Sequence, residues 1–210
     1  MVYELEALTA PRLSALIDAG VSTVVVPFGS IEHQGGHLAI GADSLLADAI
    51  GREVASRLGA VLAPTVRVGC AEQHMQRIGT MTLQARTLTE VAIELAGSLA
   101  AQGFAVIVLL STHGGNSAAL DAAVARLATS LDGAIACAPR GDVGPAPGAH
   151  SGEWLTSVLL ALRPDLVERQ RASCELASEV GVADARRGTG HIERFVTSIV
   201  ESVRTIAESQ

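Results

Sequence analysis

The 210-residue chain has no lysine, few aromatic residues and only three cysteines. Its 22 acidic residues outnumber 15 basic ones, giving a formal charge of −7. This balance argues against broad nucleic-acid binding, which needs clustered positive charge facing phosphate. Cys70, Cys137 and Cys174 are odd in number and widely spaced, so the sequence indicates neither a disulfide framework nor a cysteine zinc cluster.

Long apolar runs are also missing. No segment approaches the roughly 20 apolar residues that a membrane-spanning helix needs. Acidic Glu4 and Glu6 stand where a signal peptide would have basic and apolar regions. We therefore expect a soluble cytoplasmic protein with no membrane and no nucleic-acid partner. Hydrophobic residues make up 49% of the chain, enough for one substantial core, so residues 1–210 are expected to form a single domain.

The sequence does contain short β-branched runs that alternate with longer segments of helical periodicity. Strands are expected at 22–28, 61–68, 104–110 and 134–138, and helices at 10–19, 44–58, 89–101, 117–131, 150–162 and from 192 onwards. This alternation predicts an α/β fold, with a mostly parallel sheet covered by helices on both faces.

Side chains of the metal-ligand type follow two of these strands. Glu32 and Asp43 come after the strand that ends at Phe28, and His113 comes after the strand that ends at Leu110. The carboxyl ends of adjacent parallel strands lie together, and α/β proteins usually carry their chemistry there. Two carboxylates and one imidazole form a ligand set suited to Zn²⁺ or Mn²⁺.

Each of these three residues also has a plainer interpretation when taken alone. Asp43 can cap the helix that follows it, Glu32 can be a solvated turn residue, and His113 can belong to a tight turn. Their coincidence at two strand ends favours a functional site, because a buried group of Glu, Asp and His is costly unless it is paired or metal-bound.

Four segments carry a resemblance to a known family. Residues 29–43, GSIEHQGGHLAIGAD, resemble the creatininase-family pattern G-S-x-E-Q-H-G-P-H-L-P-x-x-T-D, and residues 111–116, STHGGN, resemble its N-G-H-G-G-N. Residues 69–83 resemble the segment G-x-S-x-x-H followed by P-G-T-x-S-L, and residues 150–157, HSGEWLTS, resemble H-A-G-x-x-E-T-S. The match extends over roughly the first three-quarters of the chain.

The resemblance implies a metal-dependent amidohydrolase with a three-layer α/β/α fold, assembled as a homo-oligomer, that opens a cyclic or linear amide with metal-activated water. By position, Glu32, Asp43 and His113 match family metal ligands. His150 matches a family histidine proposed for proton transfer, and Glu153 in the same segment is a second catalytic candidate.

Two positions depart from the family pattern. Gln34 stands where the family has a ligand histidine, and Leu155 stands where it has a glutamate. By the resemblance, both missing groups serve the second ion of a dinuclear centre. We favour one Zn²⁺ or Mn²⁺ per chain over two, because three protein ligands are enough for a single-metal hydrolase. Alternatively, Glu153, His33 or His37 supplies replacement ligands, or catalysis has been lost.

The substrate side and the function keep alternatives open. Gln34, His74 and Trp154 are the candidates for substrate binding: an orienting amide, a residue at the mouth of the site and a pocket wall. The preferred function is hydrolysis of a C–N bond in a small amide. The alternatives are a peptidase that trims a short peptide, as some relatives do, and a non-catalytic metal- or ligand-binding subunit. A phosphate-binding turn at 113–116 ranks last, since no lysine is near.

Overall fold

The computed structural model describes residues 2–144 and 148–208. The strands are β1 (Tyr3–Glu4), β2 (Thr23–Phe28), β3 (Val61–Leu62), β4 (Val106–Ser111) and β5 (Ile135–Cys137). The α-helices are α1 (Ala10–Asp18), α2 (Ala42–Leu58), α3 (Ala85–Ala100), α4 (Ser117–Leu127), α5 (Glu153–Leu162), α6 (Ala177–Val182) and α7 (Ala185–Glu208). Short 3₁₀ turns include η2 (Glu72–His74) and η3 (Gly114–Asn116).

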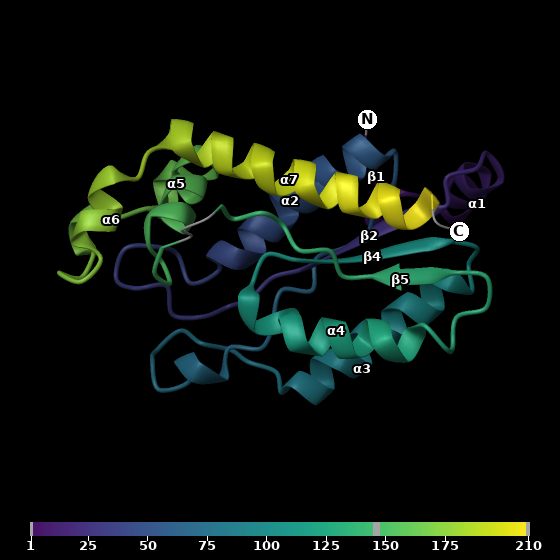
Figure 1. The fold of residues 1–210 in the computed structure, drawn as a ribbon, viewed down its shortest axis with the longest axis horizontal. Coiled ribbons are helices and arrows are strands. Elements are labelled where there is room, and N and C mark those ends of the chain that lie inside the picture. Colours follow the sequence, from purple (N-terminus) through teal and green to yellow (C-terminus); the bar gives the residue numbers. More distant parts are fainter. Residues whose placement is uncertain (1, 145–147, 209–210) are drawn as a thin grey trace.

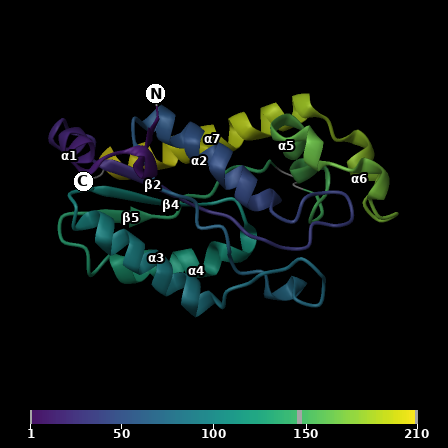
Figure 2. The ribbon, with the colours of Figure 1, turned by 180° about the vertical axis from the view of Figure 1, so that it is seen from behind.

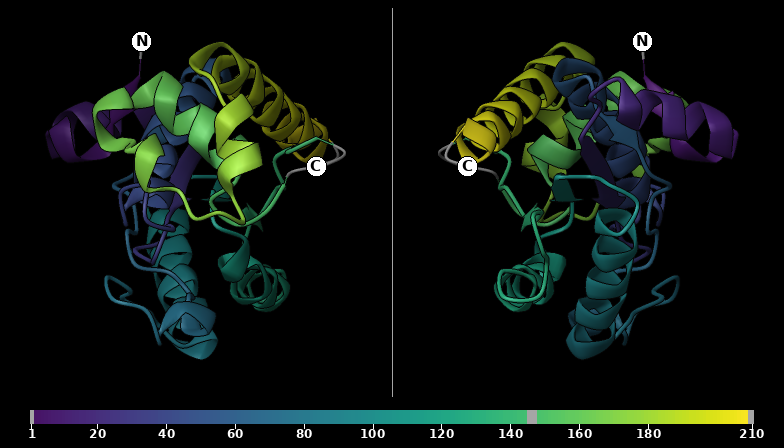
Figure 3. Two further views of the ribbon diagram at one scale, coloured as in Figure 1. Left: turned by 90° about the vertical axis from the view of Figure 1, so that its left-hand side faces the viewer. Right: turned by 90° about the vertical axis from the view of Figure 1, so that its right-hand side faces the viewer.

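The five strands form one parallel sheet in the order β1-β3-β2-β4-β5. Helices α2, α5 and α7 cover one face, and α3 and α4 cover the other (Figures 1 and 2). The end views show the same three layers (Figure 3). The predicted α/β/α architecture with a parallel sheet is thus confirmed.

Each face of the sheet has its own hydrophobic core, because neighbouring strand residues point to opposite sides. Val25 and Val108 face α2, α5 and α7, whereas Val24, Val26 and Ile107 face α3 and α4. Helix α7 approaches α5 closely at Gly188, where an added Cβ would lie 1.9 Å from the carbonyl oxygen of Ser157. No helix in the described ranges is both long and apolar enough to span a bilayer.

Two strands differ from the sequence-based expectation. The strand expected over 61–68 pairs only at Val61–Leu62, because Pro64 cannot donate to the ladder. An isolated bridge then joins Val66 to Phe28. The two-residue strand β1 was not expected, since a segment this short carries no periodicity.

Helix boundaries also differ. Helix α3 begins at Ala85 rather than Thr89, and the Thr89 hydroxyl donates to the Ala85 carbonyl from within the helix. Helix α7 begins at 185 rather than 192. Helix α2 begins before Asp43, whose side chain does not cap it. The carboxylate of Asp43 is therefore free to take part in a site.

Candidate active site

The candidate site lies where the strand order reverses. From β2 the chain continues to β3 on one side of β2 and then crosses to β4 on the other side of β2. The carboxyl ends of β2 and β4 therefore flank a topological switch point, where open α/β sheets usually bind ligands. The register places Phe28 opposite Ser111, so both strands end at the same level. Glu32 and His113 follow those ends and meet at one edge.

Three buried side chains form the core of the site. A His113 ring nitrogen lies 3.2 Å from Glu32 Oε2, and the other lies 3.4 Å from Asp43 Oδ2. The backbone brings Asp43 here because the Thr112 hydroxyl donates to its carbonyl at 2.7 Å. These three residues, Glu32, Asp43 and His113, can each offer one ligand atom to a single ion. The structure therefore brings together all three ligands predicted from the sequence.

The spacing fits a metal ion. Two ligand atoms about 2.1 Å from a tetrahedral ion lie about 3.4 Å apart, and His113 Nδ1 lies 3.4 Å from Asp43 Oδ2. The Nε2 atom of His113 also lies 2.8 Å from the Cys70 carbonyl oxygen. Because a carbonyl only accepts, Nε2 carries the proton of the neutral ring, and the lone pair of Nδ1 then faces Asp43; in the protonated ring Nδ1 donates to Asp43 instead.

Electrostatics also favour a cation at this position. Burial raises the pKa of Glu32, and the negative charge of Asp43 raises it further. Burial alone lowers the pKa of His113, but the hydrogen bond and charge of Asp43, together with the charge of Glu32, outweigh it and raise the pKa. Both shifts favour bound positive charge, which a divalent ion would supply.

Gln34 fills the space between the two carboxylates. Its Nε2 donates to Asp43 Oδ2 at 2.9 Å and to Glu32 Oε1 at 3.3 Å, and its Oε1 accepts from the Ser151 hydroxyl at 2.8 Å. The side chain is fully buried. The amide thus places a neutral donor on the two carboxylates at the position where the family pattern has a ligand histidine.

His150 and His74 lie on the outer side of Glu32. Their rings stack with centroids 4.3 Å apart. His150 Nδ1 is 3.8 Å and His74 Nε2 is 3.9 Å from Glu32 Oε1. Burial lowers the pKa of His74, and the nearby imidazole of His150 lowers it further. The sequence placed His150 and His74 at this site separately, and the structure stacks them.

Helix α5 divides its side chains between the site and the neighbouring helix. Trp154 and Leu155 line the cavity of the site. Glu153 points to α7, where His191 lies 3.2 Å from its carboxylate, and it accepts from the Ser157 hydroxyl at 2.7 Å. Trp154 stacks on His191 at 5.9 Å. Glu153 is therefore placed outside the group formed by the three ligands.

His33 and His37 are also placed away from that group. The side chain of His33 faces Arg77, with 3.4 Å between nitrogens. His37 is buried against Thr156, 3.1 Å from its hydroxyl. Neither histidine belongs to a possible metal-ligand group among the residues described in the structure. Gln34 is thus not compensated by an adjacent imidazole.

A glycine allows the close packing around His113. A Cβ on Gly115 would lie 2.1 Å from the Cys70 carbonyl oxygen and 2.4 Å from His113 Nε2. A Cβ on neighbouring Gly114 would meet nothing within 4 Å. Only Gly115 is therefore required by the geometry of this turn.

Two hollows meet at the site. A cavity of about 270 Å³ is lined by Glu32, Asp43 and His113 together with Gln34, Trp154 and Leu155. A second hollow of about 470 Å³ is lined by His33, His74 and Arg77. The segment 149–151 lines both, so His150 stands at their junction.

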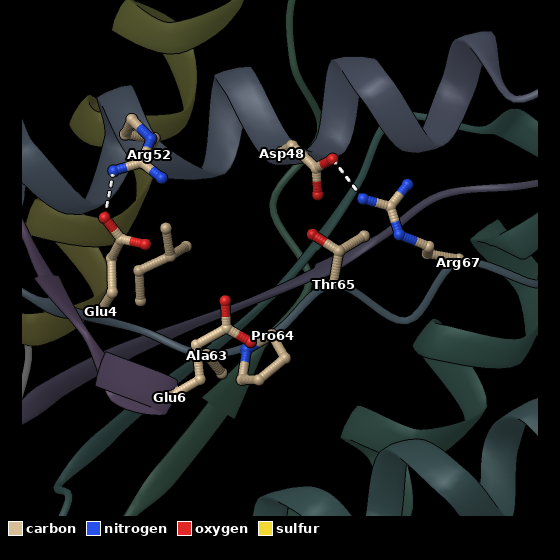
Figure 4. A pocket seen from close by; sticks show the side chains of 9 residues that line it. Glu4, Glu6, Asp48, Arg52, Ala63, Pro64, Thr65 and Arg67 are labelled. Carbon is tan, nitrogen blue, oxygen red and sulfur yellow. Dashed lines mark hydrogen bonds and ion pairs between the residues drawn. The ribbon is translucent and has the colours of Figure 1, made fainter. Parts of the chain in front are cut away.

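A separate hollow of about 260 Å³ lies at the end of β1 and β3 (Figure 4). Its charged groups pair with one another: Arg52 with Glu4 at 2.6 Å and Arg67 with Asp48 at 2.5 Å. Among the described residues its lining forms no metal-ligand group. Both possible metal-ligand groups found among the described residues include Glu32, which follows β2.

Sequence reasoning missed several polar groups of the site. Ser30 donates to Glu32 Oε2 at 2.9 Å, and Ser151 donates to Gln34. Ser151 has a positive φ of 60°, uncommon for a residue other than glycine. The sequence offered one indication that Ser151 belongs to the site: it directly follows the candidate residue His150.

The geometry defines an α/β protein with a carboxylate–imidazole cluster at the switch point of its sheet. Residues 6–203 match the creatininase family, described as creatinine amidohydrolase. The mycofactocin precursor peptide peptidase of Mycobacterium ulcerans (strain Agy99) is 34% identical over 200 residues, covering 84% of this chain and 78% of the relative.

Solved structures agree in fold. A creatininase described as "Creatininase Mn" superposes with a TM-score of 0.80 at 24% identity, covering 98% of both chains. A mutant creatininase of the Zn–Zn type superposes with a TM-score of 0.79 at 22% identity, also covering 98% of both chains. The chain therefore belongs to the creatininase family, whose members are hydrolases.

Proposed function

We propose that this chain is a metal-dependent hydrolase that cleaves an amide C–N bond with a single ion held by Glu32, Asp43 and His113. The observation that carries the proposal is the buried pair of carboxylates around one imidazole, at ligand spacing and at the switch point. An ion of the Zn²⁺ or Mn²⁺ class would lower the pKa of bound water and polarise the substrate carbonyl.

Gln34 supports one ion rather than two at the family position. Its amide donates to both carboxylates at once, and an amide nitrogen with two donor hydrogens cannot bind a cation. Leu155 lines the same cavity with an apolar side chain. The two departures from the family pattern thus remove the ligands of the second ion together, while the three ligands of the first remain.

His150 is the proposed acid–base group. Its Nε2 lies 2.9 Å from the His33 carbonyl, to which it donates, so Nδ1 keeps its lone pair and faces the site. At Nδ1 the ring can accept a proton from the attacking water and return it to the leaving nitrogen. The ring is partly exposed at the junction of the two hollows, where it can reach a substrate.

The remaining cavity groups have positioning roles in this proposal. Trp154 forms an apolar wall for the substrate, and His74 borders the second hollow. Glu153 acts indirectly: its contact with His191 positions that imidazole, and Trp154 stacks on it. Gln34 holds the two carboxylates in place and orients them toward the ion.

A short peptide is the preferred substrate class. The 34% identical relative is named a peptide peptidase, and two hollows that meet at 149–151 give an extended path on both sides of His150. A small cyclic amide is the second candidate substrate. The cavity lined by Glu32, Asp43 and His113 has a volume of about 270 Å³ and so favours a small molecule.

Activity against a panel of amides tests the proposal. Metal-loaded protein would be assayed with short peptides, lactams, creatinine and formamides, and compared with His150→Asn and with Gln102→Ala, an exposed position just after α3, as the control. We expect turnover of at least one class and a loss of about 100-fold or more in His150→Asn. Metal binding without turnover of any class would point instead to a non-catalytic subunit.

We also propose that residues 1–210 form one domain and that the chain assembles with copies of itself. Ile40, Ile78 and Met81 are exposed large apolar side chains around one turn, with Ile78 at 94% exposure. Contiguous exposed apolar side chains are a feature of interaction surfaces, and this group supports the proposed assembly. Light scattering of the purified protein, with Ile78→Ser for comparison, tests this assembly.

A further inference from the structure

The carboxylate of Glu32 presents its two oxygens to two different sets of groups. Oε2 accepts from Ser30 and faces His113. Oε1 accepts from Gln34 Nε2 at 3.3 Å and also faces His74 Nε2 at 3.9 Å and His150 Nδ1 at 3.8 Å. The carboxylate itself is 1% exposed, so its orientation is fixed by the surrounding protein.

The two imidazoles are prepared as ligands. The bond from His150 Nε2 to the His33 carbonyl leaves the Nδ1 lone pair directed at Glu32. The loop that carries His74 is held in place, because Thr80 donates to the His74 carbonyl at 3.0 Å and accepts from the His33 amide at 3.1 Å. The rings stack with an interplanar angle of 25°, so one of them must turn before both lone pairs point at the same ion.

Geometry and composition fit a divalent ion of the Zn²⁺ class. Glu32, His74 and His150 can each offer one ligand atom, all within 4.8 Å of one another. The nitrogen–oxygen separations of 3.8 and 3.9 Å are longer than the tetrahedral value of about 3.4 Å, so both imidazoles would have to move slightly toward Glu32 to bind the ion. One carboxylate and two imidazoles form a usual three-ligand zinc set with an open fourth position.

We propose that Glu32, His74 and His150 form a second cation site, bridged to the first by Glu32. Neither Gln34 nor Leu155 supplies a ligand to this site, so it differs from the second-ion position that the family pattern would predict. The Gln34 amide donates to the same Oε1 and would keep only its bond to Asp43 when the ion binds. With His150 partly exposed, it is more open than the buried first site, and we expect it to bind more weakly.

The second site has a functional consequence that rests on the proposed function. An ion there occupies the Nδ1 atom of His150, and a nitrogen that coordinates a metal cannot carry a proton. Excess Zn²⁺ should therefore suppress the hydrolysis that the first equivalent supports. The activity would rise with the first equivalent and fall as the second binds.

Calorimetric titration of the metal-free full chain with Zn²⁺ tests the site, with Co²⁺ absorption as a second readout of ligand geometry. We expect the wild type to bind one Zn²⁺ ion tightly and a second ion more weakly, giving a tight and a weak class of binding. Both His74→Ala and His150→Asn should lower the affinity of the weaker class by at least about tenfold. His191→Ala, which alters a histidine outside the site, should keep both classes.

Further variants separate this proposal from the proposed function. His113→Ala should lose the tight class and keep the weak one, whereas Glu32→Ala should lose both. A wild type that binds a single equivalent even in millimolar Zn²⁺ would overturn the second site while leaving the first intact. Retention of the weaker class in His74→Ala, with circular dichroism showing a folded variant, would also overturn it.

Discussion

Replacing Gln34 with leucine should destabilise the metal-free protein strongly. The change removes a donor shared by two buried carboxylates and the acceptor of the Ser151 hydroxyl. A hydrogen bond to a charged group contributes about 1.5–3 kcal/mol, and a buried hydroxyl without a partner costs about 1–3 kcal/mol. The longer hydrogen bond to Glu32 is assigned a smaller value than the bond to Asp43. Leucine is more apolar than glutamine, which offsets about 1–2 kcal/mol of the loss. The net decrease in the free energy of unfolding is therefore about 3 kcal/mol.

Urea denaturation in the presence of a chelator measures this loss. Gln73→Leu, at an exposed position of the loop after β3, is the matched control and should change the free energy of unfolding by less than about 0.5 kcal/mol. Saturation with Zn²⁺ should recover much of the deficit of Gln34→Leu, because the ion neutralises the carboxylates that the amide served. A loss below about 1 kcal/mol without metal would refute the role assigned to Gln34.

Three other perturbations follow from the site. Gly115→Ala should lower metal affinity by about tenfold or more and destabilise the fold, since its Cβ would displace His113, whereas Gly114→Ala should do neither; equilibrium dialysis with Zn²⁺ compares the two. Without metal, the pKa of Glu32 is raised above 4.5 and the pKa of His113 is raised above 6.5. The folded state therefore binds more protons than the unfolded state at pH values above these. As the pH rises from there, the free energy of unfolding should fall by up to about 1.4 kcal/mol per pH unit for each proton. Urea titrations at pH 5 to 8 should show a shallower fall in Glu32→Gln. Glu32→Gln should also bind metal far more weakly. It should not be less stable than the wild type at pH 8, because it removes a buried charge. A loss of both metal affinity and stability at pH 8 would contradict this account.

The strand ends and the meeting of Glu32, Asp43 and His113 could be predicted from the sequence because they depend on short-range patterns. The runs that end at Phe28 and Leu110 are mostly apolar and rich in β-branched residues, and adjacent parallel strands bring Glu32 and His113 to one edge of the sheet. The length of β3 could not be predicted as well, since a single proline ends a ladder that β-branched residues favour.

The orientations of Gln34, Glu153 and His74 depend on contacts between distant segments. Gln34 lies in a loop closed by a backbone bond from Glu32 to Ile40 at 2.9 Å. Glu153 turns to α7 because His191 lies there, 38 positions later in the chain. The stack of His74 on a histidine of the α5 segment joins two loops that no local pattern relates.

The central claim is that one ion is held tightly by Glu32, Asp43 and His113. The most direct measurement is the metal content of protein loaded with Zn²⁺ or Mn²⁺ and then dialysed exhaustively, determined by mass spectrometry for the wild type and for His113→Ala. The account predicts about one retained ion per chain in the wild type and none in the variant. No ion above background in the wild type, or equal retention in His113→Ala, would contradict it.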